Sequence, residues 1–145
     1  MKTFKQHIKE ARLKLGAKKS GGNVDGFFND LDKTTQPHPF DDRQRLHGMV
    51  GIHASPFEGG VHLHDIVNYG EAKQGHGTRT LEYLKSLADK HGVEISGTAK
   101  AYSNRPNHIT KTKKLTDWYG KHGFQIGKGN KDDGYPISYK GKKAE

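Results

Sequence analysis

Two groups of residues in this sequence have types and spacings suited to chemistry. The first, Gly75-His76-Gly77-Thr78, lies between a strand-like segment and a helix-like segment. At such a junction the unpaired N–H groups and the positive end of the helix dipole point into one concavity, which suits phosphate groups. The glycines let the backbone approach an anion, and Lys73 and Arg79 add positive charge beside the loop. A simple turn is the competing interpretation.

The second group lies on the strand-like segment before this loop, where His62, His64 and Asp65 are candidate proton acceptors. Histidine titrates near neutral pH, and water can relay a proton between such a side chain and a substrate nitrogen. We choose His64 and Asp65 as the base. The chain has ten histidines, but beyond His62 and His64 no third ligand has a recognisable spacing, so we predict no metal site.

Strand and helix patterns surround these residues. Leu46 to Ala54 and Gly60 to Tyr69 are strand candidates that we expect to pair antiparallel, because SPFEG between them has the Pro and Gly of a hairpin. A helix is expected from about Thr78 to His91, since apolar residues recur on one face and Gly92 supplies a left-handed stop. The inward residues of this helix are Leu81, Leu84, Leu87 and Ala88.

The C-terminal third continues the alternation of strand and helix. A half-buried strand is indicated by Val93, Ile95, Gly97, Ala99 and Ala101. Asn104 to His108 interrupts it, and a second helix is expected from about Lys111 to His122, ending at Gly123. Its core-facing residues are Leu115, Trp118 and Tyr119. With strands at FQI and YPISY, the order β-α-β-α-β-β predicts a mixed α/β layer.

The N-terminal part has weaker patterns. Apolar residues on one helical face predict a helix in the first fifteen residues, and AKKSGGN after it is typical of a linker. The apolar members of that face are Phe4, Ile8, Ala11 and Leu15. Residues 24 to 44 contain a short apolar cluster and then TTQPHPFDD, a run that we expect to exclude regular structure because proline fixes φ and removes a donor.

Composition limits the class of protein. A chain of 145 residues fits one domain, which we place at 23–145 after a helix and linker at 1–22. With 30% apolar residues and a mean hydropathy of -0.97 we expect a soluble protein without a membrane span. No cysteine is present, so disulfides and thiol nucleophiles are excluded and a cytosolic setting is the default.

The segments from strand to final helix resemble the GNAT superfamily of N-acyltransferases. The family pattern is strand, (Q/R)xxGxG loop, helix, strand, and a helix with Tyr before Gly-Phe. Here these parts read HLHDIVNY, AKQGHGT, TLEYLKSLADKHG, VEISGTAKAY and LTDWYGKHGF. The resemblance covers somewhat over half of the chain and implies a GNAT-like fold with a shortened N-terminal half. Ala72 and Thr112 depart from the family's usual Arg or Gln and Asn.

The resemblance also implies an activity, an acetyl-CoA-dependent N-acetyltransferase, in which an amine attacks the acetyl thioester directly. It implies that Tyr119 protonates the leaving thiolate, with packing between helix and sheet as the alternative role of this ring. Acetyl-CoA would be the co-substrate, and the acceptor amine is not indicated. The residues implied to bind acetyl-CoA are Val67, Lys73, Gln74, Gly75, His76, Gly77, Thr78 and Arg79.

The N-terminus has a second resemblance. MKTFKQHIKEA is similar to the capsid-targeting leader of internal head proteins in T-even-type tailed phages, which ends in an Ile/Leu-x-Glu site before Ala, here Ile8-Lys9-Glu10. It implies cleavage after Glu10 and a phage protein of the host cytoplasm or the head interior. Residues 1 to 20 hold seven Lys or Arg against one Glu, so DNA or the head scaffold is a candidate partner. The alternative function is therefore an inactive GNAT-like virion protein bound to DNA.

Overall fold

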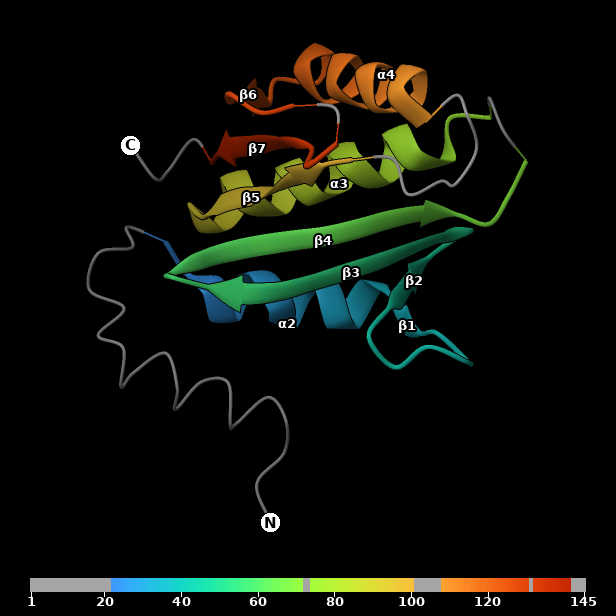
Figure 1. The fold of residues 1–145 in the computed structure, drawn as a ribbon. Coiled ribbons are helices and arrows are strands. Elements are labelled where there is room, and N and C mark those ends of the chain that lie inside the picture. Colours follow the sequence, from blue (N-terminus) through green and yellow to red (C-terminus); the bar gives the residue numbers. More distant parts are fainter. Residues whose placement is uncertain (1–21, 72–73, 101–107, 131, 142–145) are drawn as a thin grey trace. The chain divides into compact units, whose positions relative to one another are not determined.

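The computed structural model describes residues 22–71, 74–100, 108–130 and 132–141. These residues form three helices and seven strands, so the predicted mixed α/β class is confirmed (Figure 1). The chain divides into two compact units, one of residues 1–95 with 140–145 and the other of residues 96–139. The N-terminal helix expected in residues 1–15 and the interruption at 104–107 lie outside the described residues.

The first unit opens with helix α2 (Val24–Thr34), which the sequence analysis did not predict. Asn23 caps it, because its side-chain oxygen accepts a hydrogen bond from the N–H of Gly26 at 2.9 Å. The apolar residues Val24, Phe27 and Leu31 recur at helical spacing and are buried. The apolar cluster of this region is therefore one face of a capped helix.

Four antiparallel strands follow in the order β1-β2-β3-β4. Their bounds are β1 (Gln36–Pro37), β2 (Arg45–His47), β3 (Val50–Phe57) and β4 (Gly60–Asn68). The prediction that TTQPHPFDD excludes regular structure was wrong at its start, since Gln36 and Pro37 pair with Leu46 and Arg45. Proline is accepted there because it occupies a short strand at the sheet edge, where its missing N–H is harmless.

The strand expected from Leu46 to Ala54 is in fact two strands with a turn inside it. Gly48, with φ of 60°, reverses the chain between β2 and β3, and His47 pairs with Val50. The hairpin between β3 and β4 is confirmed, but Ser55, Pro56 and Phe57 belong to β3 and the turn itself is Glu58–Gly59. The antiparallel pairing and the span of β4 agree with expectation.

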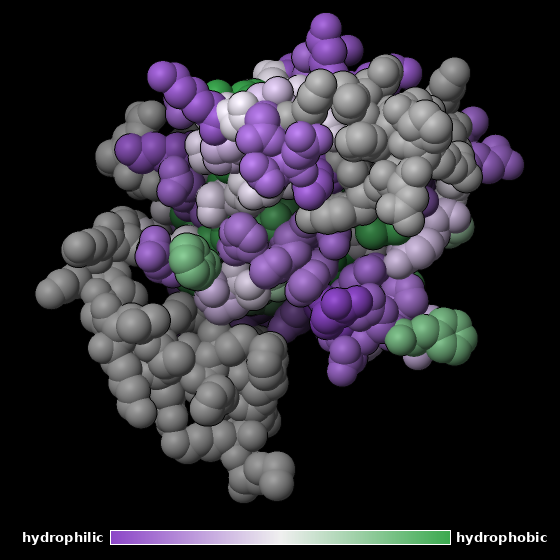
Figure 2. All heavy atoms as spheres, viewed as in Figure 1, coloured by the Kyte–Doolittle hydropathy of each residue, from purple (hydrophilic) through white to green (hydrophobic). Residues whose placement is uncertain are grey.

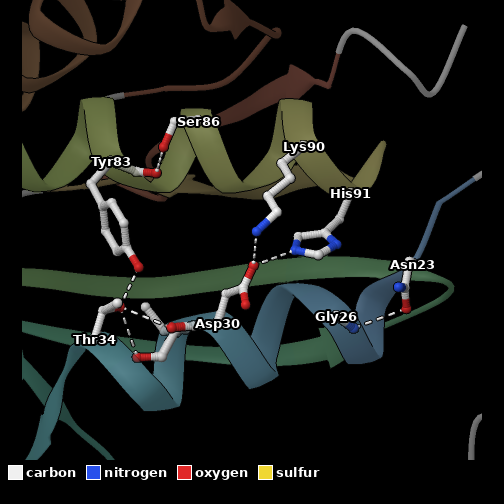
Figure 3. Close-up of polar contacts among 9 residues, drawn as sticks. Asn23, Gly26, Asp30, Thr34, Tyr83, Ser86, Lys90 and His91 are labelled. Atoms are coloured by element: carbon white, nitrogen blue, oxygen red, sulfur yellow. Dashed lines mark hydrogen bonds and ion pairs between the residues drawn. The ribbon is translucent and has the colours of Figure 1, made fainter.

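Helix α3 (His76–His91) closes the unit and confirms the helix expected between the glycine loop and Gly92. All four predicted inward residues are buried, and Gly92 ends the helix in the left-handed conformation with φ of 65°. Oδ2 of Asp30 on α2 accepts hydrogen bonds from Nζ of Lys90 at 2.8 Å and from Nε2 of His91 at 2.7 Å (Figure 3). Tyr83 and Thr34 join the same two helices by their hydroxyls.

The second unit contains most of β5 (Glu94–Ala99), helix α4 (His108–Lys121), β6 (Gln125–Ile126) and most of β7 (Tyr135–Lys140). Its strands have the order β5-β7-β6, and β6 pairs antiparallel with β7, Ile126 opposite Ile137. Helix α4 begins three residues before the expected Lys111. Tyr119 is buried as predicted, whereas Leu115 and Trp118 are half-buried.

Among the described residues, no helix has the length and apolar character that a membrane crossing requires.

Candidate functional site

The N-terminus of α3 has the features expected of an anion site. Its N-cap is Gly75, in the left-handed conformation with φ of 77°, and no side chain caps the helix there. The first helical amides have no carbonyl one turn before them, so they carry the positive end of the helix dipole. The first turn of α3 has no acidic residue to neutralise that end. Gly77 and Thr78, both half-buried, lie within this first turn.

Arg79 folds back over the same loop. Its Nη1 donates to the carbonyl of Gln74 at 3.1 Å, and its Nη2 lies 2.9 Å from Nδ1 of His76. A guanidinium has donors and no acceptor, so Nδ1 of His76 is the acceptor in this contact. The arrangement places a full positive charge beside the helix N-terminus and leaves further N–H groups of Arg79 for an anion.

The chain before this loop is shaped to receive the His76 ring. A Cβ added at Gly70 would lie 2.9 Å from Cδ2 and Nε2 of His76, so a side chain at this position would require the His76 ring to shift. The N–H of Gly70 donates to the side-chain oxygen of Asn68 at 2.9 Å, which turns the chain at the end of β4. Val67, on β4, is half-buried and pairs with Gly51 of β3. Lys73 lies outside the described residues.

His64 and Asp65 lie at an irregularity of the β3–β4 ladder. Ala54 pairs with Leu63 and His53 pairs with Asp65, so His64 is an extra residue without a cross-strand partner, a β-bulge. Such bulges re-aim side chains, and here Nε2 of His64 lies 2.9 Å from Oγ of Ser55. The ring of His64 also stacks on the ring of His53, with centroids 4.1 Å apart.

The surroundings of His64 favour its neutral form. Its pKa is lowered from the ordinary histidine value first by partial desolvation and then by His53 and His62, while the carboxylate of Asp65 acts in the opposite direction. A neutral imidazole can accept a proton. The choice of His64 as a base is therefore compatible with its environment.

Tyr119 belongs to the second unit, where it is 6% exposed. Its ring packs edge-on against Trp118, with centroids 4.9 Å apart, and against Phe124 at 5.2 Å. The packing role considered for this ring is therefore present, and any chemical role would fall on its hydroxyl.

No protein-family model and no curated protein matches this chain.

Two residues of this region were missed by the sequence analysis, His53 and Ser55. They are two positions apart on β3, so an alternating strand places them on one face, and Ser55 pairs with His62 across the hairpin. That signal was available only with the correct hairpin register. The view in Figure 2 shows mostly hydrophilic residues over the region where Figure 1 draws β3 and β4.

Proposed function

We propose that this protein is an acetyl-CoA-dependent N-acetyltransferase of the GNAT type. The observation that carries the proposal is the start of α3, where a helix without a side-chain cap begins at a left-handed Gly75 under the guanidinium of Arg79. A pyrophosphate carries the charge and the oxygen acceptors that such a terminus binds. The diphosphate of coenzyme A has this chemistry.

The order of elements along the chain supports the same proposal. After the antiparallel strands β1 to β4 come α3, β5, α4, β6 and β7, the order that the GNAT resemblance implies. Before β1 the structure describes one helix, α2, which is consistent with a shortened N-terminal half. The acceptor-binding part of the fold is proposed to lie in this shorter half, and the acceptor itself is an amine of unassigned structure.

In the proposed mechanism the acceptor amine attacks the thioester carbonyl directly. The amine must lose a proton, and we assign its removal to neutral His64, assisted by the charge of Asp65 or by a relaying water. The leaving thiolate must gain a proton, and we assign its donation to the hydroxyl of Tyr119 because this residue matches the family Tyr in position. In this proposal one side chain accepts a proton from the amine, and the other donates a proton to the thiolate.

Calorimetric titration of the full chain with acetyl-CoA tests the cofactor assignment. Gly77→Leu places a bulky side chain in the first turn of α3, so the wild-type chain should bind acetyl-CoA and this variant should not. The matched control is Gly120→Leu, at an exposed position of α4, where an added Cβ meets nothing closer than 3.9 Å. An unchanged affinity in Gly77→Leu, or absence of binding by the wild-type chain, would overturn the assignment.

A second candidate function rests on the charge of the N-terminal arm. Seven Lys or Arg against one Glu in residues 1 to 20 favour an association with DNA, as in a virion protein held in a phage head. Such binding weakens steeply with salt because counterions are released. A full chain with Lys2, Lys5 and Lys9 replaced by Gln should show a shallower salt dependence of DNA affinity. DNA binding that is absent, or unaffected by salt, would remove this candidate.

A further inference from the structure

The hydroxyl of Ser55 is in an unusual position for a surface serine, because its neighbour is a histidine nitrogen. Oγ of Ser55 on β3 lies 2.9 Å from Nε2 of His64 on β4. Ser55 has no direct pairing with His64, since its cross-strand partner is His62. The bulge at His64 brings this ring to Ser55, so the contact is a product of the local backbone irregularity.

The ring of His64 is held on two sides. His53 stacks on it with centroids 4.1 Å apart and planes 17° apart, and His62 meets it edge-on at 4.4 Å. Flanking rings restrict the rotamers of His64, so Nε2 stays within reach of the Ser55 hydroxyl. The titratable groups that face His64 are these two histidines and Asp65.

We propose that Ser55 is a nucleophile activated by His64, and that the pair accepts acyl groups from activated esters and thioesters. A serine within hydrogen-bond reach of a histidine base is the arrangement that nucleophilic catalysis requires. His64 is exposed and Ser55 half-buried, so a small reagent can reach both. The pair shares His64 with the proposed direct transfer to an amine, but its reaction with an ester needs Ser55 and does not depend on a coenzyme A site.

Acyl transfer to Ser55 requires only the ester, and water completes the cycle. The neutral His64, with its proton on Nδ1, accepts the hydroxyl proton at Nε2 while Oγ of Ser55 attacks the carbonyl carbon of the ester. The new Oγ–C bond forms, the bond from that carbon to the aryloxide or thiolate breaks, and His64 returns the proton to the leaving group. Water hydrolyses the acyl-serine by the same route, and Ser55 is regenerated.

Ser86 is a matched control for Ser55, because its hydroxyl has a carbonyl and not a histidine as its partner. It is an exposed serine on α3 whose hydroxyl donates to the backbone carbonyl of Tyr83 at 2.6 Å. A carbonyl oxygen binds that proton but cannot remove it at neutral pH. Ser86 should therefore be inert under conditions in which Ser55 reacts.

The test uses the full chain with a fluorophosphonate, which forms a stable adduct with activated serines, and with p-nitrophenyl acetate as the acyl donor. Intact mass followed by peptide mapping should place the phosphonyl group on Ser55. The Ser86→Ala variant should be labelled as the wild-type chain is, whereas Ser55→Ala and His64→Asn should lose the label. The labelling rate should rise with pH as His64 deprotonates.

Three results would overturn the proposal. They are absence of a fluorophosphonate adduct, an adduct or acetyl group on a residue other than Ser55, and full labelling of Ser55 in the His64→Asn variant. Thermal unfolding of each variant shows whether a lost label reflects lost folding. Ser55→Thr retains a hydroxyl, so this variant should keep part of the labelling that Ser55→Ala loses. Neither reagent contains coenzyme A, so these outcomes are distinguishable from failure of acetyl-CoA binding.

Discussion

The backbone N–H of Phe124 donates to the carbonyl of Tyr119 at 3.1 Å, and the rings of the same two residues lie 5.2 Å apart. The N–H of Gly123 donates to the carbonyl of Gly120 at 3.1 Å, and Gly123 has φ of 89°. Together these bonds form a Schellman motif with its usual apolar contact across the helix end. The Gly-Phe pair at the end of LTDWYGKHGF therefore has a structural explanation: it ends α4.

Replacing Gly123 by Ala should destabilise the second unit. An L-residue at this left-handed position costs about 1–2 kcal/mol of unfolding free energy. Gly120, three residues earlier and inside α4, has no positive φ. Gly120→Ala should therefore have the opposite sign, a gain of up to about 1 kcal/mol. Urea denaturation of the two variants checks the contrast. Equal effects of the two substitutions would contradict the role assigned to Gly123.

The contact of Asp30 with Lys90 and His91 predicts sensitivity to acid. Hydrogen bonds from Lys90 and then from His91 lower the pKa of Asp30 from 3.8 to about 2. A carboxyl group with a lowered folded-state pKa adds stability that is present above its unfolded pKa and is lost as pH falls toward the folded value. Unfolding free energy should therefore decline between about pH 4 and pH 2, and Asp30→Asn should make this decline shallower.

Asp41 provides the control for that experiment. Hydrogen bonds from the side chain and backbone of Arg43 lower the pKa of Asp41 to about 2 as well. The two carboxyl groups share no partner, so Asp41→Asn should remove its own part of the acid dependence, and the double variant should show the sum. An acid transition that neither substitution changes would show that other groups govern it.

His47 predicts a second pH dependence at higher pH. Burial lowers the pKa of His47 from its ordinary value, so the folded state binds fewer protons than the unfolded state between the two values. The unfolding free energy should therefore rise with pH between the lowered folded-state pKa and the ordinary histidine pKa. It should fall as pH drops from the ordinary value toward the folded-state value. His64, whose pKa is lowered too, adds to the slope. Chemical denaturation of His47→Gln across this range should give a smaller slope than the wild-type chain.

Thr80 supports the same histidine by a hydrogen bond in the core of the first unit. Its Oγ1 lies 2.8 Å from Nδ1 of His47, whose ring stacks on Tyr83 with centroids 4.8 Å apart. Thr80 is fully buried. Thr80→Val keeps the shape and removes the partner, so unfolding free energy should fall by about 1–3 kcal/mol. A neutral effect would show that His47 finds water or another partner.

Helix α3 illustrates what was predictable from sequence. Its leucines repeat on one face, Gly92 follows, and both features are local, so the helix, its buried face and its end were all correct. The split of the predicted strand at Gly48 was missed because the alternation of apolar residues continues through the turn, and Met49 there is exposed. A turn of two residues leaves the period of two intact, so hydrophobic pattern alone does not reveal it.

The candidate site also has one part that the sequence predicted and another that it did not. Gly75 at the start of α3 was predictable, because glycine and a following helical pattern lie side by side in the sequence. The fold-back of Arg79 onto Gln74 depends on the path of a loop, and the contact of Ser55 with His64 depends on a bulge. Both contacts depend on tertiary geometry, which the spacing of residues in the sequence does not reveal.

Tyr119→Phe separates the two roles considered for this residue. The substitution keeps the ring that packs against Trp118 and Phe124 and removes only the hydroxyl. If the hydroxyl protonates the leaving thiolate, acetyl transfer should slow by about 100-fold or more, while the calorimetric affinity for acetyl-CoA stays unchanged. Tyr119→Leu disturbs the packing as well, so its thermal midpoint should fall. A Tyr119→Phe variant with full transfer activity would leave this tyrosine a packing residue and require another proton donor.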